Sequence, residues 1–343
     1  MNVRAMVSAI WLPGGLLILA WVLAAGEGFG LQIPTIYLTP GLALAGALLG
    51  LRFHQMRAAF ALVVLTLAHF ALVPFFAKPP GAGAMGQVLY AGAAILLPVN
   101  LVVIAFLGER GLFTRSGLLR LSAIIAQGAV LFWLVTEAGN GPAGAAAWAF
   151  HWRALGPELD QWTYLPQPSL FVLVLGGLIL LVRFVTRPTP LTGGLLGAFV
   201  AGGAAFHMVG RGPVPEIFMM AAILGIGLAV LQEFYRMAFL DELPGLPGRR
   251  ALGAEMKKLG GRYCLAMLDV DHFKNFNDSY GYEVGDQVLK LVAARLAGVR
   301  GGGKSFRYGG EEFTTIFPAK DMEEAWPHLE DLRQAVEETS FQL

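Results

Sequence analysis

Long apolar stretches recur through the first two-thirds of this chain, and they constrain its fold more than any other feature. A stretch of about twenty apolar residues can cross a bilayer as a helix, in which every backbone polar group is satisfied internally. Eight such stretches lie near residues 7–26, 33–51, 58–77, 86–107, 117–136, 168–186, 191–209 and 216–235. Residues 1–235 are therefore predicted to form an all-α polytopic membrane bundle of about eight spans, in contact with lipid.

Charge divides the chain into two parts with different solvents. Of its 343 residues, 56% are hydrophobic and 14% are charged. Only 19 charged residues precede Asp241, whereas 30 lie between Asp241 and Leu343. We predict a membrane region over 1–235, a short linker over 236–240 and a water-soluble domain over 241–343. The net charge of +1 leaves no basic surface for nucleic acid.

The short loops predict the orientation of the bundle. Alternate connections on one side carry Arg4, Arg52, Arg57, Arg110, Arg115, Arg183, Arg187 and Arg236, and the other side carries Lys78, Arg153 and Arg211. Cytoplasmic loops are enriched in Lys and Arg, so both termini are predicted to be cytoplasmic. We favour an uncleaved first span over a signal peptide, in which Arg4 would form the n-region and the stretch "VLAAGEG" the cleavage site.

Two features on the predicted outer side are candidates for ligand binding. The loop over 137–167 contains Trp148, Trp152, Trp162 and Tyr164. It fits an interfacial aromatic belt, with a lid over a small ligand as the alternative. His69 and His207 fall in the outer halves of their spans, and Glu216 begins the last one. A structural or hydrogen-bonding role is favoured for the histidines over haem or metal binding.

The soluble part alternates predicted strands and helices. The apolar run over 263–271 predicts a buried strand with Asp269 at its carboxyl end, and Cys264 within it as a small buried residue. Val288, Leu289, Val292 and Leu296 mark one face of a helix. Two β-rich runs around a Gly-Gly step predict a hairpin. Asp321, followed three residues later by Glu324, is the predicted N-cap of a final helix.

The hairpin carries adjacent carboxylates that need an explanation. If it pairs beside the first strand, Glu311 and Glu312 come close to Asp269. Clustered carboxylates repel one another unless a cation is shared. Hard oxygen ligands without His or Cys favour Mg²⁺. Taken alone, the stretch "GGEE" also fits a solvated acidic turn that binds no ion.

Three motifs occur in order in the soluble part. They read "DELPGLPGRR", "LDVDHFKNFNDSYGYEVGDQVL" and "RYGGEEF". Together they closely resemble the GGDEF family of diguanylate cyclases, in its GGEEF form, over residues 241–343. The resemblance implies an α/β palm-like domain, which pairs as a homodimer and joins two GTP molecules into cyclic di-GMP with release of two diphosphates. It also implies a bacterial inner-membrane protein that uses Mg²⁺, with Mn²⁺ as an alternative. Residues 1–235 would then be a multi-span sensor region, in which a signal tunes the activity.

The resemblance also assigns roles to individual residues. Metal binding falls to Asp269, the carbonyl of Val270, Glu311 and Glu312, with Glu311 and Glu312 as the catalytic pair and Glu311 as the family's usual base. The backbone N–H groups of His272 and Phe273 would hold phosphate. Guanine would be read by Asn277 and Asp286, because a carboxylate accepts from the N1–H and exocyclic NH₂ that adenine cannot offer together.

The chain departs from the family pattern at several positions. Pro244 and Gly248 replace the more usual Thr and Asn, and Tyr282 replaces a His at a nucleotide-contact position. Arg300 begins "RGGG", which lacks the carboxylate of the family's Arg-x-x-Asp product-inhibition motif. The sequence also stops before the family's closing strand and its cationic phosphate contacts.

We therefore expect the domain to be partial, and the chain as given to be a weak or inactive cyclase. Two alternatives to a cyclase remain. One is a catalytically impaired GTP-binding or interaction module of a membrane signalling protein. The other is a transporter with a regulatory appendage, which the weak intramembrane charge pattern disfavours.

Overall fold

The computed structural model describes residues 3–26, 35–80, 83–140, 152–156, 161–239, 245–339 and 341. The chain forms two compact units, Met1–Glu233 and Phe234–Leu343. The predicted boundary at Asp241, the departure at Pro244, Trp148 and much of the loop over 137–167 lie outside the described residues.

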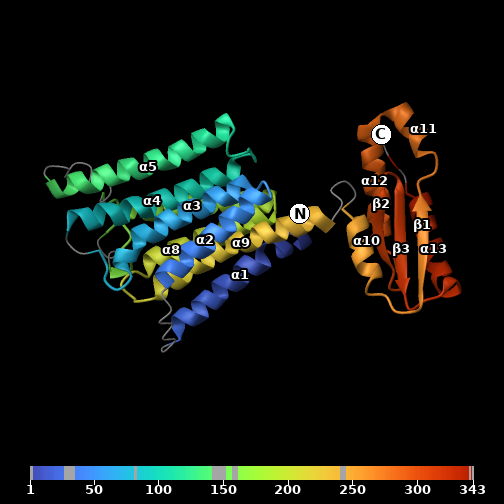
Figure 1. Ribbon diagram of the computed structural model, residues 1–343, viewed down its shortest axis with the longest axis horizontal. Coiled ribbons are helices and arrows are strands. Elements are labelled where there is room, and N and C mark those ends of the chain that lie inside the picture. The colour runs from blue at the N-terminus through green and yellow to red at the C-terminus, as the bar shows by residue number, and fades with distance from the viewer. Residues whose placement is uncertain are drawn as a thin grey trace. The chain divides into compact units, whose positions relative to one another are not determined.

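Long helices make up the first unit (Figure 1). They are α1 Val3–Ala25, α2 Thr35–Arg52, α3 Met56–Leu72, followed by the 3-10 turn η1 Val73–Phe75, α4 Ala84–Phe106, α5 Arg115–Asn140, α7 Gln167–Thr186, α8 Pro190–His207 and α9 Val214–Phe239. Each predicted apolar stretch coincides with one of these helices. Six of the helices described are long and apolar enough to cross a membrane. The helices α2 and α8 are not among those six, so eight spans remain a prediction.

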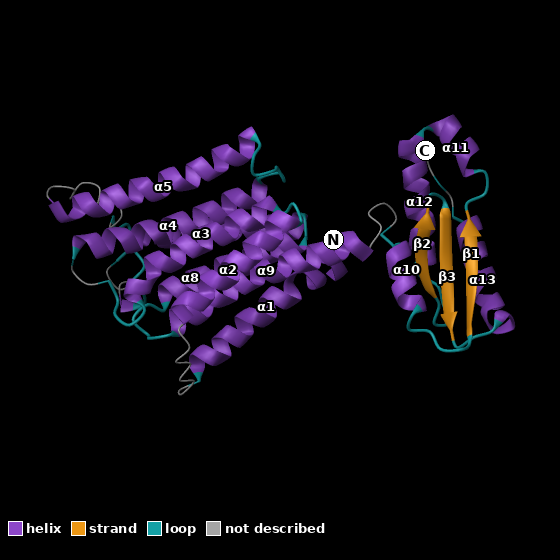
Figure 2. Ribbon diagram, in the orientation of Figure 1, coloured by secondary structure: helices purple, strands orange, loops and turns teal. Residues whose placement is uncertain are grey.

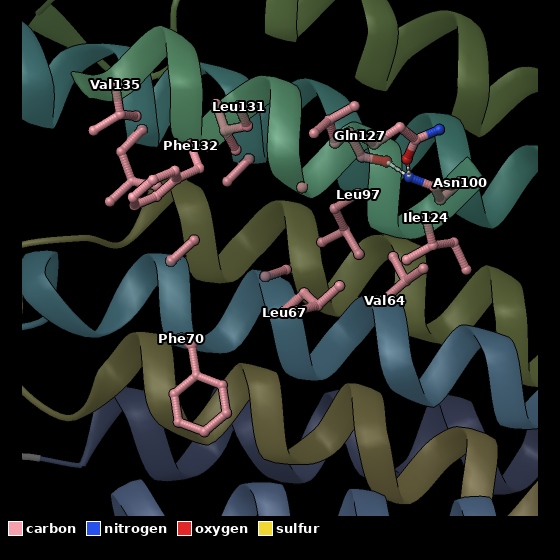
Figure 3. Close-up of a pocket in the computed structure, with 16 residues that line it drawn as sticks. Val64, Leu67, Phe70, Leu97, Asn100, Ile124, Gln127, Leu131, Phe132 and Val135 are labelled. Carbon is pink, nitrogen blue, oxygen red and sulfur yellow. Dashed lines mark hydrogen bonds between the residues drawn. The ribbon is translucent and has the colours of Figure 1, made fainter. Parts of the chain in front are cut away.

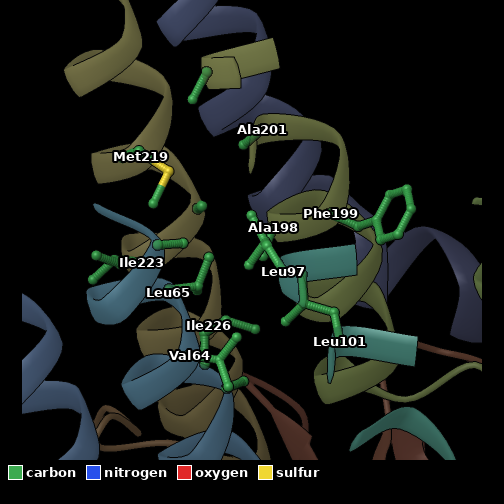
Figure 4. Close-up of a cluster of buried hydrophobic side chains, with 14 of the residues drawn as sticks. Val64, Leu65, Leu97, Leu101, Ala198, Phe199, Ala201, Met219, Ile223 and Ile226 are labelled. Carbon is green, nitrogen blue, oxygen red and sulfur yellow. The ribbon is translucent and has the colours of Figure 1, made fainter. Parts of the chain in front are cut away.

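Small residues allow the helices of this unit to pack closely around an apolar core (Figure 4). In α8, a Cβ on Gly194 would lie 2.9 Å from the Ala229 side chain, and one on Gly202 would lie 2.7 Å from Leu97. Close approach through Gly and Ala is how helices associate in lipid, where no hydrophobic driving force acts between them.

Arginine-bearing loops meet at one end of the bundle. The Nε of Arg57, at the start of α3, lies 2.7 Å from Oε1 of Glu109, which follows α4. Arg183, near the end of α7, donates through Nε to the carbonyl of Ala105 at 3.2 Å. Three of the connections that were assigned to the same side from sequence are therefore joined by direct contacts.

An apolar cavity of about 490 Å³ lies between α3, α4 and α5 (Figure 3). Its walls are mainly Leu, Val, Phe and Ala side chains. One polar pair interrupts them, in which Asn100 Nδ2 donates to Gln127 Oε1 at 2.7 Å. The pair ties α4 to α5 by a hydrogen bond within an otherwise apolar contact.

The second unit is a three-stranded antiparallel sheet with helices on both faces (Figure 2). Its elements are α10 Arg249–Met256, β1 Tyr263–Asp269, α11 Phe273–Tyr280, α12 Tyr282–Leu296, β2 Lys304–Gly309, β3 Glu312–Pro318 and α13 Met322–Glu337. The strand order is β1-β3-β2, so the hairpin strand β3 lies in the centre. The predicted strands, hairpin and closing helix are all present.

The two faces of β3 bury different side chains. Phe313 packs with residues of α11, α12 and α13, among them Leu289 and Leu332. Ile316, on the opposite face, packs with Leu252 of α10 and Phe306 of β2. The predicted apolar face of α12 is confirmed, because Leu289, Val292 and Leu296 are buried and Val288 packs against the same cluster.

The prediction that the first strand is buried on both faces is wrong for this sheet. Exposure alternates along β1, and Tyr263, Leu265 and Met267 are 44%, 39% and 53% exposed. Within the described sheet β1 is an edge strand, and α10 covers the part of that face formed by β2 and β3. Cys264, on the other face, is half-buried.

A capping box fixes the start of α13, as the sequence predicted. The Asp321 side chain accepts from the N–H of Glu324 at 2.9 Å, and the Glu324 side chain accepts from the N–H of Asp321 at 3.0 Å. Arg262, just before β1, donates to both carboxylates at 2.6 and 2.8 Å. The hydrogen bond from the Glu324 backbone, and then the one from Arg262, hold the pKa of Asp321 below its ordinary value.

We expect Asp321→Ala to accelerate hydrogen exchange of the first-turn amides of α13 by roughly fivefold at neutral pH, because the helix loses its N-cap. Because the folded pKa of Asp321 is depressed, its contribution is full above the unfolded value of about 3.9 and is lost as the pH falls through the folded pKa. The wild type and the variant should therefore converge in acid. Glu323→Ala is the control, because Glu323 lies in the same turn but does not cap the helix. An equal effect of both substitutions at neutral pH would contradict the assignment of Asp321 as the N-cap.

Candidate functional site

The β2–β3 hairpin presents the carboxylates at a tight turn. Gly310 has φ +54°, a conformation that glycine adopts without strain, and Glu311 completes the turn. Arg307 donates from Nε and Nη2 to the Gly310 carbonyl at 3.0 and 2.6 Å. The arginine therefore braces the backbone of the turn from within its own hairpin.

Strand pairing places Asp269 beside this turn. In the antiparallel register of β1 and β3, Asp269 is the partner of Glu312, and Glu312 also lies opposite Gly309 of β2. Residues directly opposite each other on paired strands have Cβ atoms about 5 Å apart. The expectation that the hairpin pairs beside the first strand and brings a glutamate to Asp269 is confirmed.

The carboxylates form no ion pair among the described residues of the second unit. Asp269 and Glu312 are exposed and Glu311 is half-buried. None of the three takes part in the ion pairs found within the described part of this unit. No three His, Cys, Asp or Glu side chains of the described residues form a ready-made metal cluster. Strand pairing thus brings Asp269 and Glu312 together, and Glu311 stands in the adjoining turn, where it does not complete a ready-made cluster among the described residues.

This donor set fits a hard divalent cation. Mg²⁺ typically binds one or two carboxylates and completes its shell with water and substrate phosphates. Asp269 and Glu312 supply two carboxylates on neighbouring strands. The carbonyl of Val270 accepts from the Phe273 N–H at 3.3 Å and keeps a second lone pair.

The segment after β1 turns sharply into α11. His272, its N-cap residue, has φ +55° and ψ 24°, in the left-handed region that non-glycine residues rarely adopt. The Phe273 N–H is engaged with Val270, while its ring is buried in the domain core. The predicted phosphate-binding amides therefore lie at a helix N-terminus directly after Asp269.

Asn277 and Asp286 lie on helices that pack together. A Cβ added to Gly285 would lie 1.8 Å from Oδ1 of Asn277, so the asparagine of α11 rests on the backbone of α12 beside Asp286. Oδ1 of Asn277 is buried and has no hydrogen-bond partner among the residues that the structure describes. A buried acceptor without a partner is costly unless a ligand or water supplies the donor. Tyr282, at the start of α12, is 76% exposed and joins neither residue.

The loop after Arg300 has glycines for steric reasons. Gly301 has φ +67°, and a Cβ there would lie 2.1 Å from the His328 ring. At Gly303, a Cβ would lie 2.7 Å from Phe317 and 2.9 Å from Val299. A side chain at Gly303, the position that carries a carboxylate in the family's product-inhibition motif, would therefore require Phe317 and Val299 to shift. Arg300 itself is exposed.

Two features of the site were missed from sequence. Arg307 braces the turn, and Gly285 makes room for Asn277. Gly285 directly precedes Asp286 in the sequence, and its spacing from Asn277 could have indicated that the two helices pack closely at this point. The sequence around Arg307 does not indicate its hydrogen bonds to the Gly310 carbonyl, because these depend on the geometry of the turn.

Comparison with known proteins agrees with this arrangement. Residues 238–343 match the family model described as "Diguanylate cyclase, GGDEF domain". Diguanylate cyclase VdcA of Vibrio cholerae is 41% identical over 111 residues, which cover 31% of this chain and 33% of VdcA. Diguanylate cyclase DgcP of Pseudomonas aeruginosa is 39% identical over 119 residues, which cover 32% of this chain and 18% of DgcP.

A solved structure gives a similar match. The coiled coil and GGDEF domain of DgcB from Caulobacter crescentus, in complex with c-di-GMP, is 35% identical, with a TM-score of 0.31. The match covers 33% of this chain and 63% of that one. Residues 238–343 of this chain are thus similar to the GGDEF domain family, by its family model and by sequence relatives of which the chain spans about a third or less.

Proposed function

We propose that this chain is a membrane-anchored diguanylate cyclase that joins two GTP molecules into cyclic di-GMP. The observation that carries the proposal is the pairing of Asp269 with Glu312 across β1 and β3, next to the turn that holds Glu311. Relatives named as diguanylate cyclases support it at 41% and 39% identity over this domain.

The proposed roles are those that the resemblance to the GGDEF family implies for these residues, and the positions of the residues support them. Asp269, Glu312 and the Val270 carbonyl would hold Mg²⁺, with Glu311 at the turn as a further ligand and as the base for the 3′-hydroxyl. When bound, the metal neutralises phosphate charge and lowers the pKa of the attacking hydroxyl. The backbone around His272, where α11 begins, would orient the phosphates through N–H groups and the helix dipole.

The reaction needs two copies of the domain. The 3′-oxygen of each nucleotide attacks the α-phosphate of the other, two P–O bonds form, and two diphosphates leave. Each domain holds one GTP, so we propose that two domains meet face to face. Asn277 of α11, which rests on Gly285 of α12, and Asp286, the next residue after that glycine, would select guanine.

The bundle would place this domain in the cytoplasm, where GTP and Mg²⁺ are found. Support comes from six helices that are long and apolar enough to span a membrane. The contacts of Arg57 with Glu109 and of Arg183 with Ala105 bring arginine-rich connections to one end of the bundle. A signal received by the bundle would then tune synthesis.

We expect Asp269→Asn and Glu311→Gln each to reduce cyclic di-GMP formation from GTP and Mg²⁺ by about two orders of magnitude or more, since each removes a metal ligand or the base. The measurement is product formation by the detergent-solubilised chain. Glu283→Gln, an exposed carboxylate of α12, is the matched control. Near wild-type turnover in either variant would remove that residue from the site, and GTP binding without product in the wild type would favour a non-catalytic module.

Guanine selection gives a second expected outcome. Inosine triphosphate lacks the exocyclic NH₂, so the wild type should prefer GTP over it by roughly tenfold or more in kcat/KM. Asp286→Ala should lower kcat/KM for GTP until it is close to the value for inosine triphosphate. If the variant keeps the full preference, Asp286 does not read the base.

We expect no inhibition by cyclic di-GMP at the Arg-x-x-Asp position that binds the product in the family. Added cyclic di-GMP should leave the initial rate unchanged, because Arg300 has no carboxylate partner in its loop and a side chain at Gly303 would require Phe317 and Val299 to shift. Gly303→Asp should destabilise the domain through Phe317 and Val299 and should not create inhibition. Inhibition that disappears in Arg300→Ala would contradict this reading.

A further inference from the structure

The apolar cavity between α3, α4 and α5 contains a single polar spot. Among the described residues that line it, none is charged, and the only polar side chains are Asn100 of α4 and Gln127 of α5 (Figure 3). Asn100 is 9% exposed and Gln127 is half-buried. All three helices are among those long and apolar enough to cross a membrane. The cavity therefore offers two amides in surroundings that are otherwise hydrocarbon.

The two amides leave one acceptor and one donor group over. Asn100 Nδ2 donates to the Leu96 carbonyl at 2.8 Å and to Gln127 Oε1 at 2.7 Å, so both of its hydrogens are used. These are the hydrogen bonds of the two side chains within the part of the chain that the structure describes. Asn100 Oδ1 and Gln127 Nε2 remain, on amides that are bonded to each other. An unpaired amide group is costly in apolar surroundings, so a partner in the cavity would be stabilising.

The cavity is elongated along the helices. Its lining extends from Leu89 to Asn100 on α4 and from Ile124 to Val135 on α5, a rise of roughly 16 Å on each helix. The polar pair lies toward one end, because Asn100 is the last lining residue of α4 and Gln127 lies within one turn of Ile124. The remaining length is apolar.

Water does not suit most of this space. A bound water needs two to four polar partners, and cavities lined by Leu, Ile and Phe stay dry. A volume of about 490 Å³ lies in the range of small-molecule sites, which are mostly apolar and orient their ligand through a few polar groups. Leu67, Phe70 and Phe132 of the lining are 50%, 53% and 70% exposed, so a molecule dissolved in lipid can reach the cavity from the surface of the bundle.

We propose that this cavity binds a neutral aliphatic molecule that carries a hydroxyl group at one end. The hydroxyl oxygen accepts from Gln127 Nε2, and the hydroxyl hydrogen is donated to Asn100 Oδ1, so one group satisfies both amides. The chain fills the apolar length, which matches roughly a dozen carbon atoms joined by bonds of about 1.5 Å. A charged head group would find no counter-charge among the described lining residues. The tail of a bilayer lipid fits the walls but gives the amides no partner.

A second apolar cavity, of about 460 Å³, lies between α4 and α5 and shares Gln127 but not Asn100. Gly128 lines the first cavity only, and Ala126 lines the second only. A Cβ on Gly128 would meet nothing within 4 Å, so a larger side chain can be introduced there without a clash at its base. These neighbouring positions of α5 therefore give a matched pair of substitutions, each of which fills one cavity.

Photo-crosslinking of the full-length chain in lipid nanodiscs tests the site without reference to cyclase activity. The probe is a 1-dodecanol derivative with a diazirine on its chain, and 1-dodecanol and dodecane are compared as competitors at equal concentration in the membrane. Label should fall on peptides from 64–71, 89–100 and 124–135. The alcohol should compete about tenfold better than the alkane, as expected for one or two net hydrogen bonds. Equal competition by the alkane would show that the cavity takes up hydrocarbon only and would overturn the proposal.

Three variants locate the binding. Gly128→Leu should remove the label because it fills the cavity, whereas Ala126→Leu should keep it. Gln127→Leu should keep the label but lose the preference for the alcohol, because the donor is gone while the apolar walls remain. Circular dichroism and gel filtration establish that each variant is folded. Label that persists in folded Gly128→Leu, or a preference that survives in Gln127→Leu, would contradict the site; the competition in the wild type decides the proposal even if a variant fails to fold.

Discussion

The antiparallel pairing of β1 with β3 is the constraint on which the second unit depends. It makes Asp269 and Glu312 direct neighbours across two strands, at the end of the sheet where the chain turns into α11 (Figure 2). Two carboxylates in that relation repel each other, and the described ion pairs offer them no counter-charge. The fold can keep this register at low cost only because the pair faces solvent, where water or a cation screens the repulsion.

The same pairing organises the groups around it. Arg307 braces Gly310 so that Glu311 projects from a fixed turn, and α11 starts within four residues of Asp269. Asn277 then rests on Gly285, and its buried oxygen has no partner among the described residues. The proposed metal-binding edge, the proposed phosphate-binding helix start and the proposed base-reading pair thus follow one another along a short stretch of chain. Fixing one strand register therefore fixes most of the proposed site.

The sequence predicted the features of this domain that are local in the chain. Asp269 at a strand end, the Gly-Gly hairpin and the Asp321 cap each depend on residues only a few positions apart. Three other features were not predicted. They are the exposed face of β1, the lack of space for a side chain at Gly301 beside His328, and the hydrogen bond of Thr39 with Glu216. Each of these depends on segments that meet only in the folded chain, for which periodicity and motif spacing carry no signal.

The central claim is that Asp269 and Glu312 share a divalent cation with the nucleotide. Hydrogen exchange at the end of β1 and across the β2–β3 turn measures this directly, with Mg²⁺ and a non-hydrolysable GTP analogue added together and separately. Joint addition should slow exchange at Asp269 and at residues 310–313 in the wild type, and should have little effect on those amides in Asp269→Asn. Equal protection in the two proteins, or none in the wild type with nucleotide bound, would contradict the claim.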